Sequence, residues 1–200
     1  MEKKHSIYLP VRLATRNEVK ELIYGASYCP AFNITPSPSE MKDRDEILKN
    51  AYNNLIYFGR AFLPNDFLKK SESAPFHYEI AKQMITTEPG ARICNIIPRG
   101  HGKSVISKAA IMHKLCFSKT DQQHFVAWVS EEQGQAIDHL KYIRSHFENN
   151  KMIKYYFGTM DGGSVGKRWT EKDIVTAKGD RVIAKGTSQR LRGRAEVDVR

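Results

Sequence analysis

Apolar residues recur at three- and four-residue steps through several stretches of this chain, which is the period of an amphipathic helix. Ser73-Ala74-Pro75 precedes one such stretch with a capping hydroxyl and a proline suited to the first helical turn. Ser130 and Gln133 have the spacing of a capping box at the start of another apolar-periodic stretch. The pattern predicts helices over 45–59, from Pro75 to Pro89, over 103–116, after Ser130 and over 152–157.

The strand pattern is confined to four shorter runs. The apolar runs 92–97 and 124–129 predict strands, and the second is apolar enough to be buried on both faces of a parallel sheet. The runs 173–177 and 181–185 flank Lys178-Gly179-Asp180, which predicts a β-hairpin.

Helices and strands alternate over 47–200, so we expect one α/β domain there, with a mostly parallel sheet flanked by helices. Residues 1–46 are interrupted by prolines at Cys29-Pro30 and over 35–39, which disfavour regular helix and predict a partly helical or irregular arm. Residues 197–200 begin another ordered pattern without completing it, so the sheet is expected to be incomplete at its C-terminal end.

The segment between the second predicted helix and the third carries the most informative chemistry. It reads Pro98-Arg99-Gly100-His101-Gly102-Lys103-Ser104 and lies where a predicted strand turns into a helix N-terminus. Such a glycine-rich loop presents backbone N–H groups and the positive end of the helix dipole to an anion. Lys103 can reach the β- and γ-phosphates of a nucleotide, and Ser104 can reach Mg²⁺.

The match to the general phosphate-loop pattern G-x-x-x-x-G-K-[ST] is partial, because Ile97 stands where its first glycine belongs. The part that contacts phosphate, Gly102-Lys103-Ser104, is intact, and Gly100 adds backbone freedom inside the loop. The loop therefore predicts a P-loop NTPase-type domain that binds ATP and Mg²⁺. A glycine-rich turn with an exposed lysine is the other interpretation.

Composition narrows the possible partners and compartments. The chain has 40% hydrophobic and 27% charged residues, which indicates a folded domain, and its net charge of +10 favours a polyanionic partner such as nucleic acid. The three cysteines are widely spaced, which predicts reduced core thiols in an intracellular protein, and no zinc-ligand spacing is present. We expect a protein that is neither secreted nor inserted in a membrane.

These segments together resemble the N-terminal ATPase part of the large subunit of tailed-bacteriophage terminases, the motors that package DNA into a procapsid. The resemblance spans about residues 50 to 200. It rests on five segments in the family's order: Phe58-Gly59-Arg60-Ala61-Phe62-Leu63-Pro64, Pro75-Phe76-His77-Tyr78-Glu79, the loop with Arg99, Trp128-Val129-Ser130-Glu131-Glu132-Gln133, and Gly186 to Arg194.

The resemblance implies roles for individual residues around ATP. Arg99 would sense or neutralise charge on the γ-phosphate, beside the catalytic Lys103. The alternative role for Arg99 is an ion pair with a neighbouring acidic residue. Phe76 would stack on adenine and His77 would bond its edge, although Phe76 equally suits the first core position of its helix. His101 is expected to be a loop residue that binds nucleotide without a catalytic role.

Two acidic residues follow the apolar run 124–129 in the manner of a Mg²⁺-binding pair. Because Glu131 and Glu132 fall in the expected first turn after Ser130, we assign them to capping instead. In the family the catalytic acids follow the basic loop. In this chain the position of those acids would lie beyond Arg200. We therefore expect this chain to bind ATP and to hydrolyse it slowly.

The basic loop is the expected contact for duplex DNA or for a neighbouring subunit in a ring, through Arg190, Arg192 and Arg194. A solvated basic loop is the plain alternative. The resemblance further implies a portal protein and a small terminase subunit as partners, a homo-oligomeric ring, and action in the cytoplasm of the host cell. A helicase-like P-loop ATPase and a non-catalytic nucleic-acid-binding fragment remain as other functions.

Overall fold

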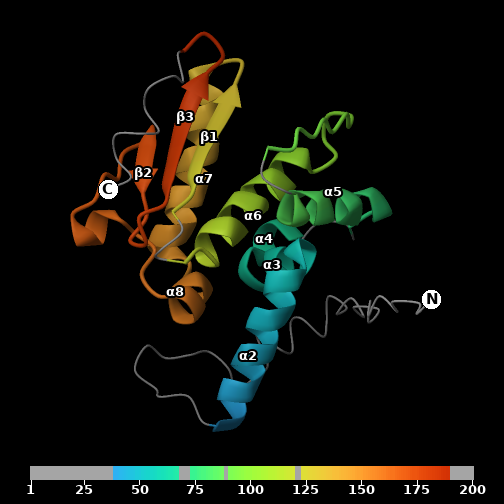
Figure 1. Ribbon diagram of the computed structural model, residues 1–200, viewed down its shortest axis with the longest axis vertical. Helices are drawn as coiled ribbons and strands as arrows, with labels where there is room; N and C mark the ends of the chain where they lie inside the picture. Colours follow the sequence, from blue (N-terminus) through green and yellow to red (C-terminus); the bar gives the residue numbers. More distant parts are fainter. Residues whose placement is uncertain (1–37, 68–72, 88–89, 120–122, 190–200) are drawn as a thin grey trace.

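The structure, a computed structural model, describes residues 38–67, 73–87, 90–119 and 123–189, with side chains from residue 44 onward. It is a mixed α/β architecture in which helices flank a small three-stranded sheet (Figure 1). In chain order the elements are α2 (Pro38–Asn53), α3 (Leu55–Phe62), α4 (Pro64–Phe67), α5 (Pro75–Thr86), α6 (Lys103–Cys116), β1 (Phe125–Ser130), α7 (Gln133–Asn149), α8 (Lys151–Phe157), the 3₁₀ turn η1 (Gly163–Val165), β2 (Asp173–Val175) and β3 (Arg181–Gly186).

The sheet has the order β1-β3-β2. β1 runs parallel to β3, and β2 pairs antiparallel with β3, so the predicted hairpin is confirmed. The described sheet is therefore mixed, with one parallel and one antiparallel strand pairing. α7 packs against the face that carries Trp128, Val182 and Ala184, and the Trp128 ring lies 4.5 Å from the His139 ring.

Two expectations about strands are wrong. The run 92–97 forms no strand, and the Ile96 side chain is 93% exposed. No described strand lies beside this run, and apolar composition alone cannot supply the hydrogen-bond partners that a strand requires. β1 is an edge strand of the described sheet, so Phe125 and Val129 on the face away from α7 are exposed rather than buried.

The first predicted helix is two helices with an earlier start. α2 begins at Pro38, a position where the fixed φ of proline suits the helix and its missing N–H costs nothing. Asn54 then leaves the helical region, with φ −140° and ψ 107°. Its side chain accepts a hydrogen bond of 3.0 Å from the Tyr57 N–H and so caps α3.

The core gathers around α3, which is apolar on nearly all sides. Phe58 and Phe62 are fully buried there and contact rings from other elements, including Phe157 of α8 at 6.3 and 5.2 Å. Burial of a side chain of this size contributes about 2 to 3 kcal/mol. α3 thus holds α6 and α8 in fixed positions around it.

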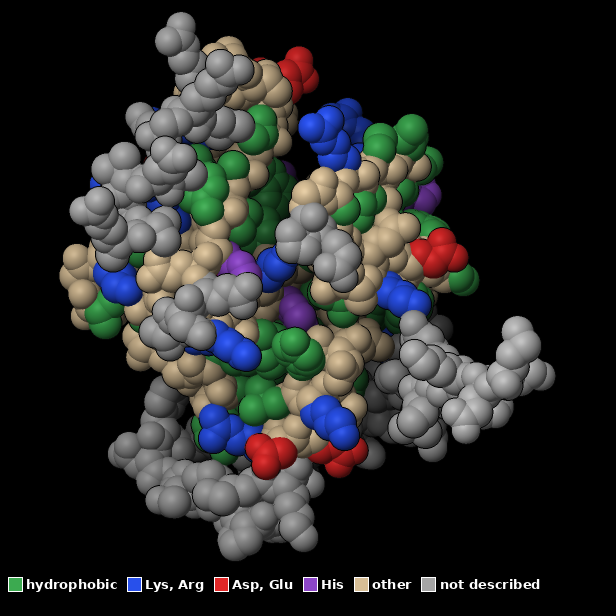
Figure 2. All heavy atoms as spheres, in the orientation of Figure 1, with side chains coloured by type: hydrophobic (Ala, Val, Ile, Leu, Met, Phe, Trp, Pro, Cys, Tyr) green, Lys and Arg blue, Asp and Glu red, His purple; other side chains and the backbone are tan. Residues whose placement is uncertain are grey.

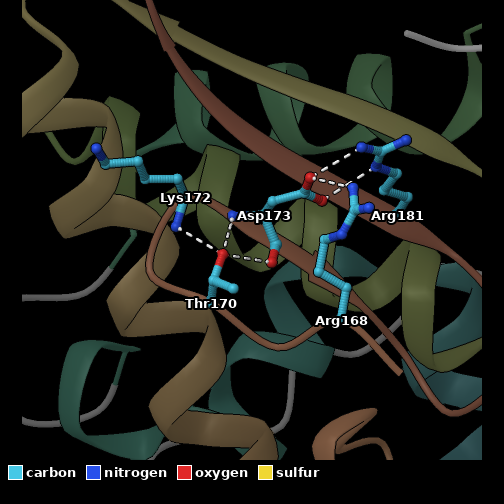
Figure 3. A network of polar contacts seen from close by, with 5 residues as sticks. All are labelled: Arg168, Thr170, Lys172, Asp173 and Arg181. Atoms are coloured by element: carbon cyan, nitrogen blue, oxygen red, sulfur yellow. Dashed lines mark hydrogen bonds and ion pairs between the residues drawn. The ribbon is translucent and has the colours of Figure 1, made fainter. Parts of the chain in front are cut away.

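A charged network fixes the free end of β2 (Figure 3). The Asp173 carboxylate accepts hydrogen bonds from Arg181 at 3.0 and 2.8 Å and from Arg168 at 2.9 Å, while its backbone bonds Thr170. Burial disfavours the ionised carboxylate, but the bonds from the two arginines outweigh burial and hold the pKa of Asp173 below its ordinary value. The network joins β2, β3 and the preceding loop.

None of the helices in the described part of the chain has both the length and the apolar character of a membrane span.

Candidate functional site: a cavity at the start of α6

The glycine-rich loop, residues 98–104, turns directly into α6 as predicted. Gly100 and Gly102 have φ of +85° and +73°, a region that side-chain-bearing residues rarely adopt. Gly102 is the N-cap of α6, and its carbonyl accepts the first helical hydrogen bond from Ile106 N–H at 3.0 Å. Because the first amides of an α-helix have no acceptor within the helix, those at the start of α6 are available to an anion.

A cavity of about 850 Å³ opens at this helix start. Its volume lies in the usual range for sites that bind small molecules. Every predicted nucleotide-binding residue lines it: Phe76, His77, Arg99, Gly100, His101, Gly102, Lys103 and Ser104. The structure therefore brings together two segments that are separated by more than twenty residues in the chain.

Phe76, at the start of α5, faces two cavities. It lines the main cavity and a smaller one of about 350 Å³, which Glu79, Gln83 and Asn95 also line. The Phe76 ring is half-buried and also packs against the core. The two interpretations of Phe76, core residue and ring available to a ligand, are thus compatible in this geometry.

His77 lies in the first turn of α5 beside the loop, and both of its ring nitrogens are engaged. The Ala74 N–H donates to His77 Nδ1 at 3.0 Å, and His77 Nε2 lies 2.9 Å from the carbonyl oxygen of His101. Ala74 is the N-cap of α5, so the predicted capping hydroxyl of Ser73 is not used. The His77 ring caps the helix in its place.

His101 and Arg99 differ in how they are held. His101 Nδ1 lies 3.0 Å from the Arg99 carbonyl oxygen, so the ring of His101 braces the loop from within. The Arg99 side chain is exposed, and no acidic residue among those described forms an ion pair with it. The alternative interpretation, an ion pair between Arg99 and a neighbouring acidic residue, is therefore not supported in the described part of the chain.

Asp66 of α4 also lines the cavity, although it is not among the site residues predicted from the sequence. Tyr142 of α7 donates a hydrogen bond to Asp66 Oδ2, and the Lys108 amine lies 3.6 Å from the centre of the Tyr142 ring. Burial and the Asp66 carboxylate raise the pKa of Tyr142, so the phenol stays protonated as a donor. In the sequence, Asp66 lies in no recognisable motif, so no local signal marked it as a site residue.

The predicted capping box before α7 does not form. The helix begins at Gln133 with Glu132 as its N-cap, and no side-chain cap bond is made. The Gln133 side chain instead accepts a hydrogen bond of 2.8 Å from Gln189. Glu131 and Glu132 precede α7 instead of lying in its first turn as expected, and both are exposed and do not line the cavity.

The remaining candidates lie elsewhere. Arg190, Arg192 and Arg194 are outside the described residues. Cys94 is exposed, contrary to the expectation of a core thiol, whereas Cys116 is buried and burial raises its pKa. Within the ranges that the structure describes, no group of three or more His, Cys, Asp or Glu side chains could hold a metal ion.

Lys103 and Arg99 line the cavity together with one carboxylate, Asp66. Figure 2 shows Lys and Arg side chains on the α5 side of the hollow between the sheet and the α5 half and near its base, with histidines near the middle of this face. Together with the net charge of +10, this surface suits an anionic ligand.

No protein-family model, no curated protein and no solved structure matches this chain.

Proposed function

We propose that this chain is the ATP-binding part of a terminase large subunit, which couples ATP hydrolysis to the movement of duplex DNA into a procapsid. One observation carries the proposal: Lys103 and Ser104 begin a 14-residue helix at the edge of a large cavity that the whole glycine-rich loop lines. This is the arrangement through which helix N-termini bind phosphate groups. A P-loop NTPase fold is part of the proposal.

The residues present suit a nucleotide with Mg²⁺. The loop amides and the Lys103 ammonium would bind the phosphates, and the Ser104 hydroxyl is the type of ligand that Mg²⁺ takes in such loops. Bound Mg²⁺ would neutralise charge on the β- and γ-phosphates. The exposed Arg99 guanidinium is placed in the same cavity lining and would add a second positive group near the γ-phosphate.

The DNA-packaging part of the proposal rests on the terminase-like residues and on the basic charge. Arg190, Arg192 and Arg194 would contact the DNA backbone or a neighbouring subunit in a ring. The portal protein, the small terminase subunit and the host cytoplasm as the place of action are proposed on the same resemblance.

ATP titration of the wild-type chain and of Lys103→Ala tests the nucleotide site. Loss of a hydrogen-bonded charge costs about 1.5 to 3 kcal/mol, so the variant should bind Mg·ATP at least about tenfold more weakly in isothermal titration calorimetry. Lys114→Ala is the matched control, because Lys114 lies exposed in the last turn of the same helix and should leave the affinity unchanged.

The outcomes separate the three functions. Equal affinity of Lys103→Ala and wild type, or no binding by either, would refute the ATP site and favour a non-catalytic nucleic-acid-binding fragment. With the ATP site established, competition between duplex and single-stranded DNA distinguishes the motors. A packaging enzyme should prefer duplex, whereas a preference for single strands would favour a helicase-like ATPase.

A further inference from the structure

We propose that His77 is a positioning residue, which sets the conformation of the glycine-rich loop from α5 instead of bonding the nucleotide base. The inference rests on the proposed function, because it assigns a control of the same nucleotide site. It starts from the two hydrogen bonds of the His77 ring.

The partners of the ring fix its tautomer. The Ala74 N–H can only donate, so His77 Nδ1 accepts and carries no proton. The proton of the neutral ring is then on Nε2, which donates to the carbonyl oxygen of His101 at 2.9 Å. With the acceptor and the donor of the ring both used within the protein, neither nitrogen is left for the edge of a base.

The carbonyl that accepts this bond belongs to the same peptide unit as the Gly102 N–H. This unit is planar and trans, so the His101 C=O and the Gly102 N–H point in opposite directions. By holding the carbonyl, His77 also fixes the direction of the Gly102 N–H. That amide directly precedes Lys103 and the first turn of α6.

The loop needs such a tether because its backbone is permissive. Two glycines with positive φ, Gly100 and Gly102, flank His101, and such residues adopt several backbone conformations at similar free energy. The contact is close: a Cβ on Gly102 would lie 3.4 Å from His77 Nε2. His77 thus restricts the loop from outside, while the His101 ring bonds the Arg99 carbonyl from within.

Two isosteric substitutions separate the helix-capping bond from the loop bond. In His77→Asn the side-chain oxygen takes the place of Nδ1 and keeps the bond to Ala74, but no donor reaches His101. In His77→Gln the side-chain amide takes the place of Nε2 and keeps the donor to His101. A residue that only capped α5 would tolerate Asn, whereas a positioning residue requires the donor that Gln retains.

The first readout is hydrogen exchange of the ligand-free protein, followed over residues 99–105. We expect exchange in this segment to be about fivefold faster in His77→Asn and close to wild type in His77→Gln, with similar melting temperatures for both variants. Unchanged exchange in His77→Asn overturns the inference whether or not ATP binds. This readout is therefore independent of the proposed function.

The second readout is the affinity for Mg·ATP in the same calorimetric assay. His77→Asn should bind about fivefold more weakly than wild type, and His77→Gln should restore the affinity. If Lys103→Ala abolishes binding but His77→Asn binds as wild type, the nucleotide site stands and the role of His77 is refuted. If the wild-type chain binds no ATP, the proposed function fails and the exchange result alone decides the inference.

Discussion

Gly162 lies so close to the hairpin that no side chain fits at its position. A Cβ there would lie 1.6 Å from the carbonyl oxygen of Val175, a backbone atom that cannot move aside. Its φ of −68° is ordinary, so the constraint is space rather than backbone conformation. We predict that Gly162→Ala lowers the free energy of unfolding by about 3 kcal/mol, measured by urea denaturation.

The matched control is another glycine with the opposite surroundings. Gly134 lies in the first turn of α7, and a Cβ added there meets nothing within 4 Å. Gly134→Ala should therefore raise the free energy of unfolding by about 0.5 to 1 kcal/mol, because alanine loses less backbone entropy in a helix. Equal unfolding midpoints for the two alanine variants would contradict the close packing of Gly162.

At the scale of elements, one buried carboxylate joins α6, β1 and the hairpin. Asp180 is fully buried and accepts hydrogen bonds from the Ser118 hydroxyl at 2.5 Å, the His124 N–H at 2.9 Å and the Thr176 hydroxyl at 3.3 Å. Each donor comes from a different segment. The carboxylate therefore fixes the end of α6 and the start of β1 relative to the β2–β3 turn.

We predict that Asp180→Ala lowers the free energy of unfolding by about 3 kcal/mol or more, because three donors, two of them on buried side chains, lose their acceptor. Ser118→Ala, which removes one donor and leaves the carboxylate two others, should cost about 1 kcal/mol. Urea denaturation of both variants checks the order. An Asp180→Ala variant as stable as Ser118→Ala would show that the carboxylate does not join the three segments.

The sequence predicted the elements whose signal is local. The helix at 103–116 and the hairpin around 178–180 are confirmed, because apolar period and turn residues act within a few positions. The run 92–97 is not a strand, since a strand depends on a partner distant in the chain. The loop at 98–104 could likewise be found from sequence, because its signal is local. The place of Asp66 in the cavity and the bond from His77 to the loop could not, because both depend on residues that are distant in the chain.

For the whole molecule, three histidines of α6 and α7 link folding to pH. Burial is the main cause that lowers the pKa of His113, His139 and His146 below the ordinary 6.5. For His113, bonds from Nε2 to the carbonyls of Ala51 and Tyr52 oppose this effect without cancelling it. These side chains are thus neutral in the folded protein at pH values where the unfolded chain protonates them.

The sign of the pH dependence follows from this difference. Each histidine contributes stability that is present above pH 6.5 and is lost as the pH falls below it, since the unfolded chain then binds more protons. We predict that the free energy of unfolding decreases as the pH falls from 6.5 and that the decrease is smaller in His113→Gln, whose amide can still donate to Ala51 or Tyr52. Urea denaturation across this pH range measures both slopes. NMR titration of the ring protons identifies which histidine is responsible, and equal slopes for wild type and His113→Gln would show that His113 does not link folding to protonation.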